Sequence, residues 1–313
     1  MTSTKSEYID KKTMNLLTCI LLLTCSVVLS GILSDEISKY AKDGLRLCFG
    51  VIIGSVFPFM ILTDIITNMA NFESIHPLRR IFERIFKING AAISAFIIGI
   101  ICGFPIGVKV ASELYQNGTI SKDEAERLIG FANNTGPAFI ISGIGVGMRN
   151  SIADGLILYF SMFVSAIISG TIFGIGKTPS ELSAENKRAN YNFAKSVTGA
   201  AQNTVNICGF VVLFSVISGI THIIIKNEFI NSVIMVFLEI SNCAKNLATT
   251  DIYSKAHSLI ITSFAVSFSG ISVHMQAKSL LLETDISMKT YYKTKLVQGI
   301  CSAVLTGLLI YII

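Results

Sequence analysis

Long apolar runs alternate with short polar segments along this chain. A helix needs roughly 20 mostly apolar residues to cross a hydrocarbon core of about 30 Å, because it rises about 1.5 Å per residue. Five runs meet that length, the last of them short but almost free of polar groups: about 14–33, 46–68, 152–175, 197–225 and 296–313. The first run lacks a clear small-x-small cleavage site, so we expect a retained span and not a signal peptide.

Four further apolar runs are interrupted by helix breakers or by polar side chains. Proline removes a backbone donor and glycine adds backbone freedom, so a run that contains both is not expected to form one regular helix. Hydrocarbon excludes polar groups unless protein or water satisfies them. The interruptions are Gly103-Phe104-Pro105-Ile106-Gly107 in 91–114, Asn133-Asn134-Thr135-Gly136-Pro137 in 128–147, Glu239, Ser241 and Asn242 in 231–248, and Ser267, Ser269, Gly270 and His274 in 257–278.

The order of these segments predicts an internal repeat. Plain and interrupted runs follow one another in the same sequence in 46–175 and in 197–313. The predicted organisation is therefore a tail, first span and loop over 1–45, a first repeat over 46–175, a cytoplasmic linker over 176–196 and a second repeat over 197–313.

The positions of the 25 Lys and Arg residues test the topology. If all nine runs cross the membrane, the charges divide almost evenly between the two sides. If 91–114 and 231–248 are re-entrant hairpins, 18 of the 25 lie on the side of the amino terminus. Positive residues favour the cytoplasmic side, so the second arrangement is preferred. It predicts an all-α polytopic protein of the cell membrane, with a cytoplasmic amino terminus, about seven spans, two re-entrant hairpins and an inverted repeat.

The composition excludes several classes of protein. The chain is 51% hydrophobic and 14% charged, whereas soluble domains carry about a quarter charged residues. Its seven cysteines all lie in apolar runs, which is typical of buried thiols and not of disulfides or a zinc site. The net charge of +5 is spread between apolar runs, so no nucleic-acid partner is expected. The chain has no histidine pair at metal-binding spacing and no Gly-x-Ser-x-Gly motif, so we expect neither an enzyme nor a bound cofactor.

Inverted repeats with broken helices are the construction of secondary transporters. Interrupted helices expose unpaired amides and carbonyls, and a helix amino end carries about half a positive charge, which suits a polar or anionic solute. The alternative is that the glycines and prolines only mark kinks. We expect transport of a small solute, with a coupling Na⁺ or H⁺ left open.

Candidate binding residues follow from the interruptions. Glu239 is the clearest signal, because an acidic group at mid-membrane usually faces a cavity; it would bind a coupling ion or pair with Lys245. Lys109 would neutralise a carboxylate or reach to the interface. The full candidate set is Gly103, Phe104, Pro105, Gly107, Lys109, Asn133, Asn134, Thr135, Gly136, Glu239, Ser241, Asn242, Ser267 and Ser269.

One stretch of the chain resembles a known family. Gly103-Phe104-Pro105-Ile106-Gly107, then Ser121-Lys122-Asp123-Glu124-Ala125-Glu126-Arg127 and Phe131-Ala132-Asn133-Asn134-Thr135-Gly136-Pro137-Ala138-Phe139-Ile140, is similar to sporulation integral membrane proteins of the YlbJ type. That family belongs with the nucleoside recognition or Gate-domain proteins, which are similar to the core of concentrative nucleoside transporters. The resemblance covers roughly 45–313 and is most specific over 99–148.

The resemblance implies a membrane carrier of spore-forming bacteria, associated with loading dipicolinate into the developing spore. Two alternatives stay open: a nucleoside carrier of the same fold, and a membrane assembly or signalling protein that transports nothing. The expected partners are a small-molecule solute and the lipid bilayer, and a homo-oligomer stays open.

Overall fold

The computed structural model describes residues 31, 34–54, 57, 58, 60–62, 65, 76–181 and 192–312. These residues form helices joined by turns, and no strand occurs among them, which confirms the all-helical prediction. The predicted span 14–33 lies almost wholly outside this part of the chain, and the predicted span 46–68 lies partly outside it. Their crossing of the membrane therefore stays a prediction.

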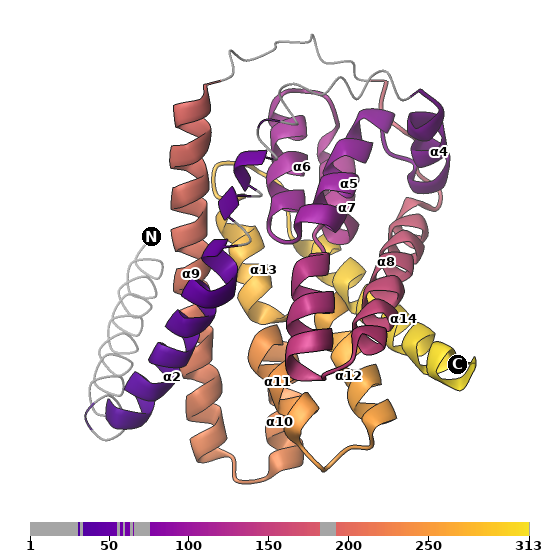
Figure 1. Ribbon diagram of the computed structural model, residues 1–313. Helices are drawn as coiled ribbons and strands as arrows, with labels where there is room; N and C mark the ends of the chain where they lie inside the picture. The colour runs from indigo at the N-terminus through magenta and orange to yellow at the C-terminus, as the bar shows by residue number, and fades with distance from the viewer. Residues whose placement is uncertain are drawn as a thin grey trace, which may run out of the picture.

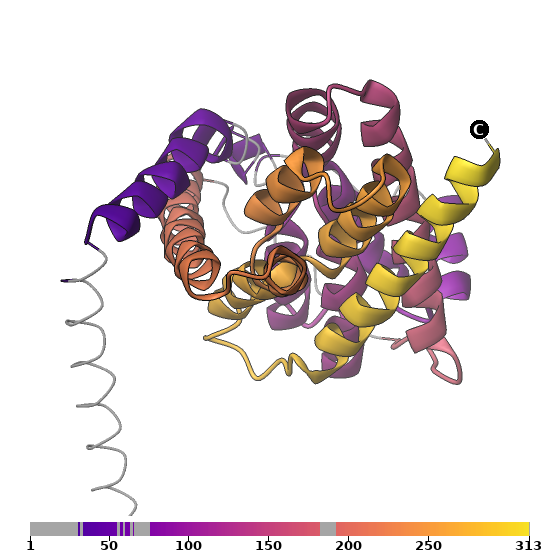
Figure 2. The same ribbon diagram turned by 90° about the horizontal axis from the view of Figure 1, so that it is seen from below.

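Four stretches of helix are long and apolar enough to cross a membrane. They are α8 (Ile152–Gly174), α9 (Phe193–Ile224), α12 with α13 (Lys255–Phe268 and Gly270–Ser279) and α14 (Lys289–Ile312). Helix α14 begins before the predicted start at 296. Figure 2 shows α14 running beside α12, and these helices pack on each other. Large apolar side chains such as Phe160, Val205 and Leu308 are more than half exposed on these helices, as expected of a surface that faces lipid.

Two pairs of short helices occupy the predicted hairpin segments. The first pair is α5 (Ile93–Cys102) with α6 (Ile106–Gln116), and the second is α10 (Glu228–Leu238) with α11 (Ile240–Thr249). A helix of this length is roughly 15–17 Å long, about half of the hydrocarbon thickness. In Figure 1 the first pair lies towards the top of the molecule and the second towards the bottom.

A broken helix follows each hairpin. In the first half, α7 (Lys122–Ala132) ends at Asn133, and a non-helical stretch leads to the π-helix η4 (Ala138–Met148). In the second half, Ser269 in the left-handed conformation separates α12 from α13. Each half therefore runs hairpin, broken helix and long helix, in the predicted order.

Residues 76–86 form helix α4 (His76–Phe86), which precedes the first hairpin. Its Phe82 and Phe86 rings are buried against Phe131, with centroids 6.3 and 4.6 Å away, whereas Leu78 and Ile81 on the same helix are about half exposed. After α4 the chain bends by 101° into the segment that contains α5. The helix thus has one face for the core and one for its surroundings, as an interfacial helix requires.

The carboxylate of Glu124 holds three segments together at the start of α7. It accepts hydrogen bonds from the backbone nitrogens of Asn89, Ser121 and Ser180, over 2.7, 2.8 and 2.9 Å. Burial raises the pKa of Glu124, but the hydrogen bonds from Ser180, Ser121 and Asn89 outweigh it and hold the pKa below its ordinary value. This carboxylate therefore ties α7 to the start of the first hairpin and to the segment that follows α8.

Arg127 caps the carboxyl end of α4. Its guanidinium donates to the carbonyls of Phe86 and Lys87, each over 2.9 Å, and to the carboxylate of Asp123 over 2.9 Å. These carbonyls end a helix and would otherwise lack partners. These contacts fix the beginning of α7. They thereby also fix the position of the helix break at its other end.

Candidate functional site

Each hairpin tip packs against a helix break. A Cβ atom on Gly103 would lie 2.8 Å from the backbone nitrogen of Gly136, so the first tip touches the first break directly. A Cβ atom on Gly270 would lie 3.1 Å from the carbonyl oxygen of Leu238 and 3.4 Å from the nitrogen of Glu239. Glycine at these positions permits main chain to meet main chain.

The two helix breaks also touch each other. The hydroxyl of Thr135 donates to the carbonyl oxygen of Val266 over 3.0 Å, and the hydroxyl of Ser269 approaches the same oxygen at 3.4 Å. A continuous path of contacts therefore runs from the first hairpin tip through both breaks to the second tip. It brings together Gly103, Thr135, Gly136, Ser269 and Glu239 of the predicted set.

The other predicted residues differ in their surroundings. Gly107 lies against the carbonyl of Ala132 with no room for a side chain, and Phe104 and Pro105 belong to the packed tip. Lys109 lies 3.8 Å from Glu113, one helical turn further along α6. Ser267 is buried, and its hydroxyl has no hydrogen-bond partner within the described part of the chain.

Lys295 is the most buried cation at the breaks, and the pattern of apolar runs missed it. Its side chain is fully buried, and its ammonium group donates to the carbonyl oxygen of Asn133, to Oδ1 of Asn134 at 3.4 Å and to Oε1 of Gln298 at 2.9 Å. In the described ranges, no carboxylate lies within 4 Å of this amine. The ammonium is held by uncharged oxygens alone.

Two amides complete this network. Gln298 donates to Oδ1 of Asn134 over 2.7 Å, and Asn133 donates from Nδ2 to the phenol oxygen of Tyr291 over 3.0 Å. Oδ1 of Asn133 is buried without a partner in the part of the chain that the structure describes. The sequence signal was a polar stripe on one face of α14, all of it fully buried: Tyr291, Lys295, Gln298, Ser302 and Thr306.

The carboxylate of Glu239 caps the amino end of α11. It accepts from the backbone nitrogens of Ser241 and Asn242, over 3.0 and 2.7 Å, and only 4% of the residue is exposed. Among the described residues it makes no ion pair within 4 Å, so the alternative of pairing with Lys245 is wrong. The backbone amides of α11, and not a lysine, are therefore the groups that this side chain contacts.

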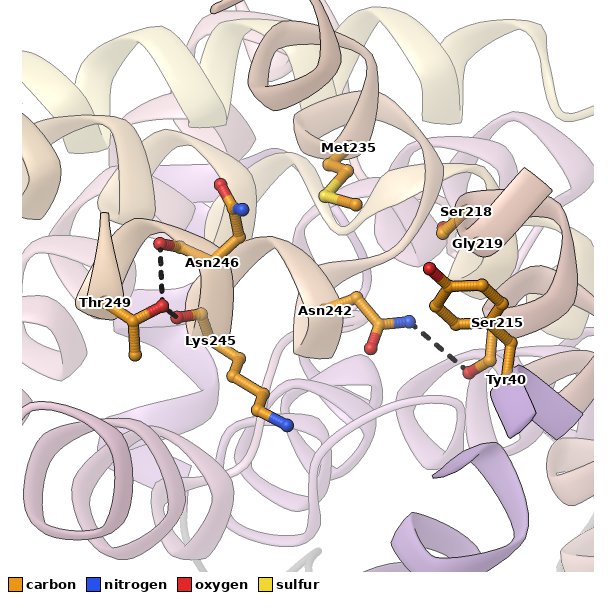
Figure 3. Close-up of a pocket in the computed structure, with 9 residues that line it drawn as sticks. All are labelled: Tyr40, Ser215, Ser218, Gly219, Met235, Asn242, Lys245, Asn246 and Thr249. Atoms are coloured by element: carbon orange, nitrogen blue, oxygen red, sulfur yellow. Dashed lines mark hydrogen bonds between the residues drawn. The ribbon is translucent and has the colours of Figure 1, made fainter. Parts of the chain in front are cut away.

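A pocket of about 210 Å³ lies beside this hairpin, between α2 (Ser34–Leu47), α9, α10 and α11. Figure 3 shows its lining. The described residues that line it are Tyr40, Ser215, Ser218, Gly219, Met235, Asn242, Lys245, Asn246 and Thr249. Of the predicted site residues, only Asn242 lines the pocket; its Nδ2 lies 3.4 Å from the hydroxyl oxygen of Ser215.

The polar groups of the pocket are incompletely satisfied. Ser218 is 2% exposed, and its hydroxyl has no hydrogen-bond partner among the residues described. Lys245 is the single charged side chain in the described lining, and its amine makes no ion pair within this part of the chain. The pocket thus offers donors and a positive charge without a carboxylate to neutralise it.

The described residues hold no cluster of histidine, cysteine and acidic side chains that would bind a metal ion. His274 donates from Nε2 to the carbonyl oxygen of Phe268 over 2.8 Å, at the end of α12. Its ring lies edge-on to that of Tyr291, with the centroids 5.2 Å apart. This histidine therefore serves the second break as a hydrogen-bond donor.

No protein-family model matches the chain, and no solved structure matches it. The chain is 27% identical, over 332 aligned residues, to the "Sporulation integral membrane protein YlbJ" of Bacillus subtilis (strain 168). The alignment takes in 92% of this chain and 80% of that protein. The resemblance to the YlbJ type is thereby confirmed. A YlbJ-type relative together with four long apolar helices supports a place in a membrane.

Proposed function

We propose that this chain is an integral membrane carrier of a small anionic solute that acts during sporulation. The observation that carries the proposal is the pocket beside the second hairpin, in which Lys245 is the one charged group of the described lining. The relative's name supplies the link to sporulation. The solute class follows from the lining, because an amine without a carboxylate partner attracts an anion.

The hydrogen-bonding groups of the pocket support an oxygen-rich solute. Ser218 offers a hydroxyl that has no partner in the described chain, and the amides of Asn242 and Asn246 supply further donors. The amino end of α11 is already occupied by the carboxylate of Glu239, so Lys245 supplies the positive charge that a solute meets here. A planar dicarboxylate such as dipicolinate has this chemistry and is our candidate solute.

The arrangement of the helices supports transport. Two hairpins of half-membrane length approach two helix breaks from opposite ends of the molecule, as Figure 1 shows. We interpret them as re-entrant hairpins in an inverted repeat, within a protein of about seven spans whose amino terminus is cytoplasmic. Movement of a hairpin against its break would then open the site to one side at a time. Glu239, at the second tip, is our candidate for a coupling proton.

Ligand binding to the purified protein tests this proposal. We expect dipicolinate to raise the melting temperature Tm saturably, because a ligand that binds only the folded state stabilises it. Lys245→Gln should remove this shift while leaving the Tm without ligand unchanged. Lys289→Gln, at an exposed lysine at the start of α14, is the matched control and should retain the shift.

The same assay separates the alternatives. A saturable shift with uridine and none with dipicolinate would favour a nucleoside carrier of the same fold. No saturable shift with either solute would favour a membrane assembly protein. Uptake of labelled dipicolinate into proteoliposomes, lost in Lys245→Gln, would establish transport.

A further inference from the structure

At the first helix break, the side chain of Lys295 lies where a bound cation could lie. Asn133 is the C-cap residue that follows the end of α7, and its carbonyl oxygen accepts from Lys295. The carboxyl end of a helix carries about half a negative charge. In transporters with broken helices, such ends and unwound carbonyls coordinate the coupling Na⁺.

The acceptors around Lys295 match the needs of one small cation. An ammonium group has three hydrogens to donate, and here it meets three oxygens: the carbonyl of Asn133, Oδ1 of Asn134 and Oε1 of Gln298. Carbonyl and amide oxygens are also the uncharged ligands that hard metal cations take. Oδ1 of Asn133, on the residue that supplies the carbonyl, is buried and has no partner among the described residues.

A structural lysine in a span usually pairs with a carboxylate or reaches to the interface. Lys295 does neither, because it is fully buried and no carboxylate lies within 4 Å of it among the described residues. Its charge is compensated by the end of α7 and by amide dipoles. Uncharged oxygens are ligands with which proteins also bind metal cations, whereas a salt bridge requires a carboxylate.

The second break is filled in a related way. The carbonyl of Phe268, at the end of α12, accepts from Nε2 of His274. Both half-helices therefore end on a nitrogen donor that belongs to the chain. Neither carbonyl is left open for an ion from solution.

We propose that Lys295 is a tethered cation that occupies the place of a Na⁺ at the first helix break, so that this protein needs no Na⁺. The consequence for coupling rests on the carrier function proposed above, whereas the test does not measure transport. If the carrier proposal fails, the salt response below still decides the role of Lys295.

The test compares the Tm of purified protein in NaCl and in choline chloride at equal ionic strength. The wild-type protein should have the same Tm in both salts. Lys295→Ala should have a lower Tm in choline chloride, and Na⁺ should raise it saturably by roughly 2–4 °C as the ion fills the vacated site. Lys295→Met fills the space without charge and should show no Na⁺ response.

Ser302→Ala is the matched control, since Ser302 is buried on the same face of α14 and bonds to Ser263 at 2.7 Å, away from the break. It should lower the Tm equally in both salts. A Na⁺-specific rise in the wild-type protein overturns the proposal by itself and needs no variant. A folded Lys295→Ala without a Na⁺ response overturns it too. If Lys295→Ala does not accumulate, the milder Lys295→Gln takes its place in the comparison.

Discussion

The hydroxyl of Thr135 donates to the carbonyl oxygen of Val266 over 3.0 Å and so joins two helix breaks that are 131 residues apart in the chain. The two breaks form a single buried centre, and the hairpin tips lie on its outer sides, against Gly136 and Gly270. The hydrogen bond between the breaks therefore links the two halves of the chain at this centre.

The bond between the breaks predicts a stability effect. Thr135→Val keeps the volume of the side chain and removes the hydroxyl, so we expect it to lower the free energy of unfolding by about 1 kcal/mol. Thr198→Val is the control, because Thr198 is exposed and bonds only within its own helix. Thermal denaturation of the purified variants measures the difference. Equal stability of Thr135→Val and the wild-type protein would show that the bond does not hold the centre.

The first hairpin tip predicts a strict need for glycine. Gly103 has φ of 84° and ψ of −178°, a conformation that only glycine adopts readily, and it touches Gly136. We expect Gly103→Ala to destabilise the protein by roughly 2–3 kcal/mol, through backbone strain and overlap with Gly136. Gly118 also has a positive φ, of 71°, but a Cβ atom there would meet open space. Gly118→Ala should therefore cost about 1 kcal/mol. Similar losses in the two variants would mean that the contact with Gly136 contributes nothing.

Much of the fold could be predicted from the sequence, because helix breakers in apolar runs are local signals. The interruptions at 103–107, 133–137 and 239 all coincide with helix ends. The chain order of hairpin, broken helix and long helix is also a local property. The span count and the inversion of the repeat stay predictions, since both depend partly on residues outside the described ranges.

The site was harder to predict because it depends on contacts between distant helices. The predicted span begins at 296, so Lys295 falls just outside it, and a lysine at the end of an apolar run usually reaches water. Its burial follows from α7 packing against α14; the polar stripe on α14 marks a buried face, but no local pattern shows which helix covers it. The pocket is likewise made by α2, α9 and the second hairpin together, so only Asn242 was found in advance.

The hydrogen bonds that cap α11 predict how substitution of Glu239 changes the free energy of unfolding. Since the carboxylate bonds to the amides of Ser241 and Asn242, Glu239→Gln should lower the free energy of unfolding by about 1 kcal/mol. Lys245→Met should leave stability nearly unchanged. The double variant should show an interaction energy below about 0.5 kcal/mol, as expected of residues without a direct contact. If the double variant is more stable than Glu239→Gln alone, then Glu239 and Lys245 do form an ion pair in the protein.

The last prediction concerns Glu124, which lies before the predicted span 128–147, and its effect on stability at low pH. Its pKa is lowered in the folded protein, because the hydrogen bonds from Ser180, Ser121 and Asn89 outweigh the effect of burial. A carboxyl group with a lowered pKa binds protons more readily in the unfolded state. The stability that it supplies is therefore complete above the ordinary pKa of 4.5 and is lost as the pH falls through the lowered value.

We expect Glu124→Gln to lower the free energy of unfolding by about 2 kcal/mol at pH 7, the contribution of hydrogen bonds to a charged group. Below about pH 5 the wild-type protein should lose stability more steeply than this variant, so that the two curves converge on acidification. Glu181→Gln, at an exposed glutamate on the same side of the molecule, should follow the wild-type curve. Thermal denaturation between about pH 3.5 and 8 measures all three proteins, because this range runs from below the ordinary pKa of 4.5 to well above it. Parallel curves for the wild-type protein and Glu124→Gln would mean that other carboxylates govern the response to acid.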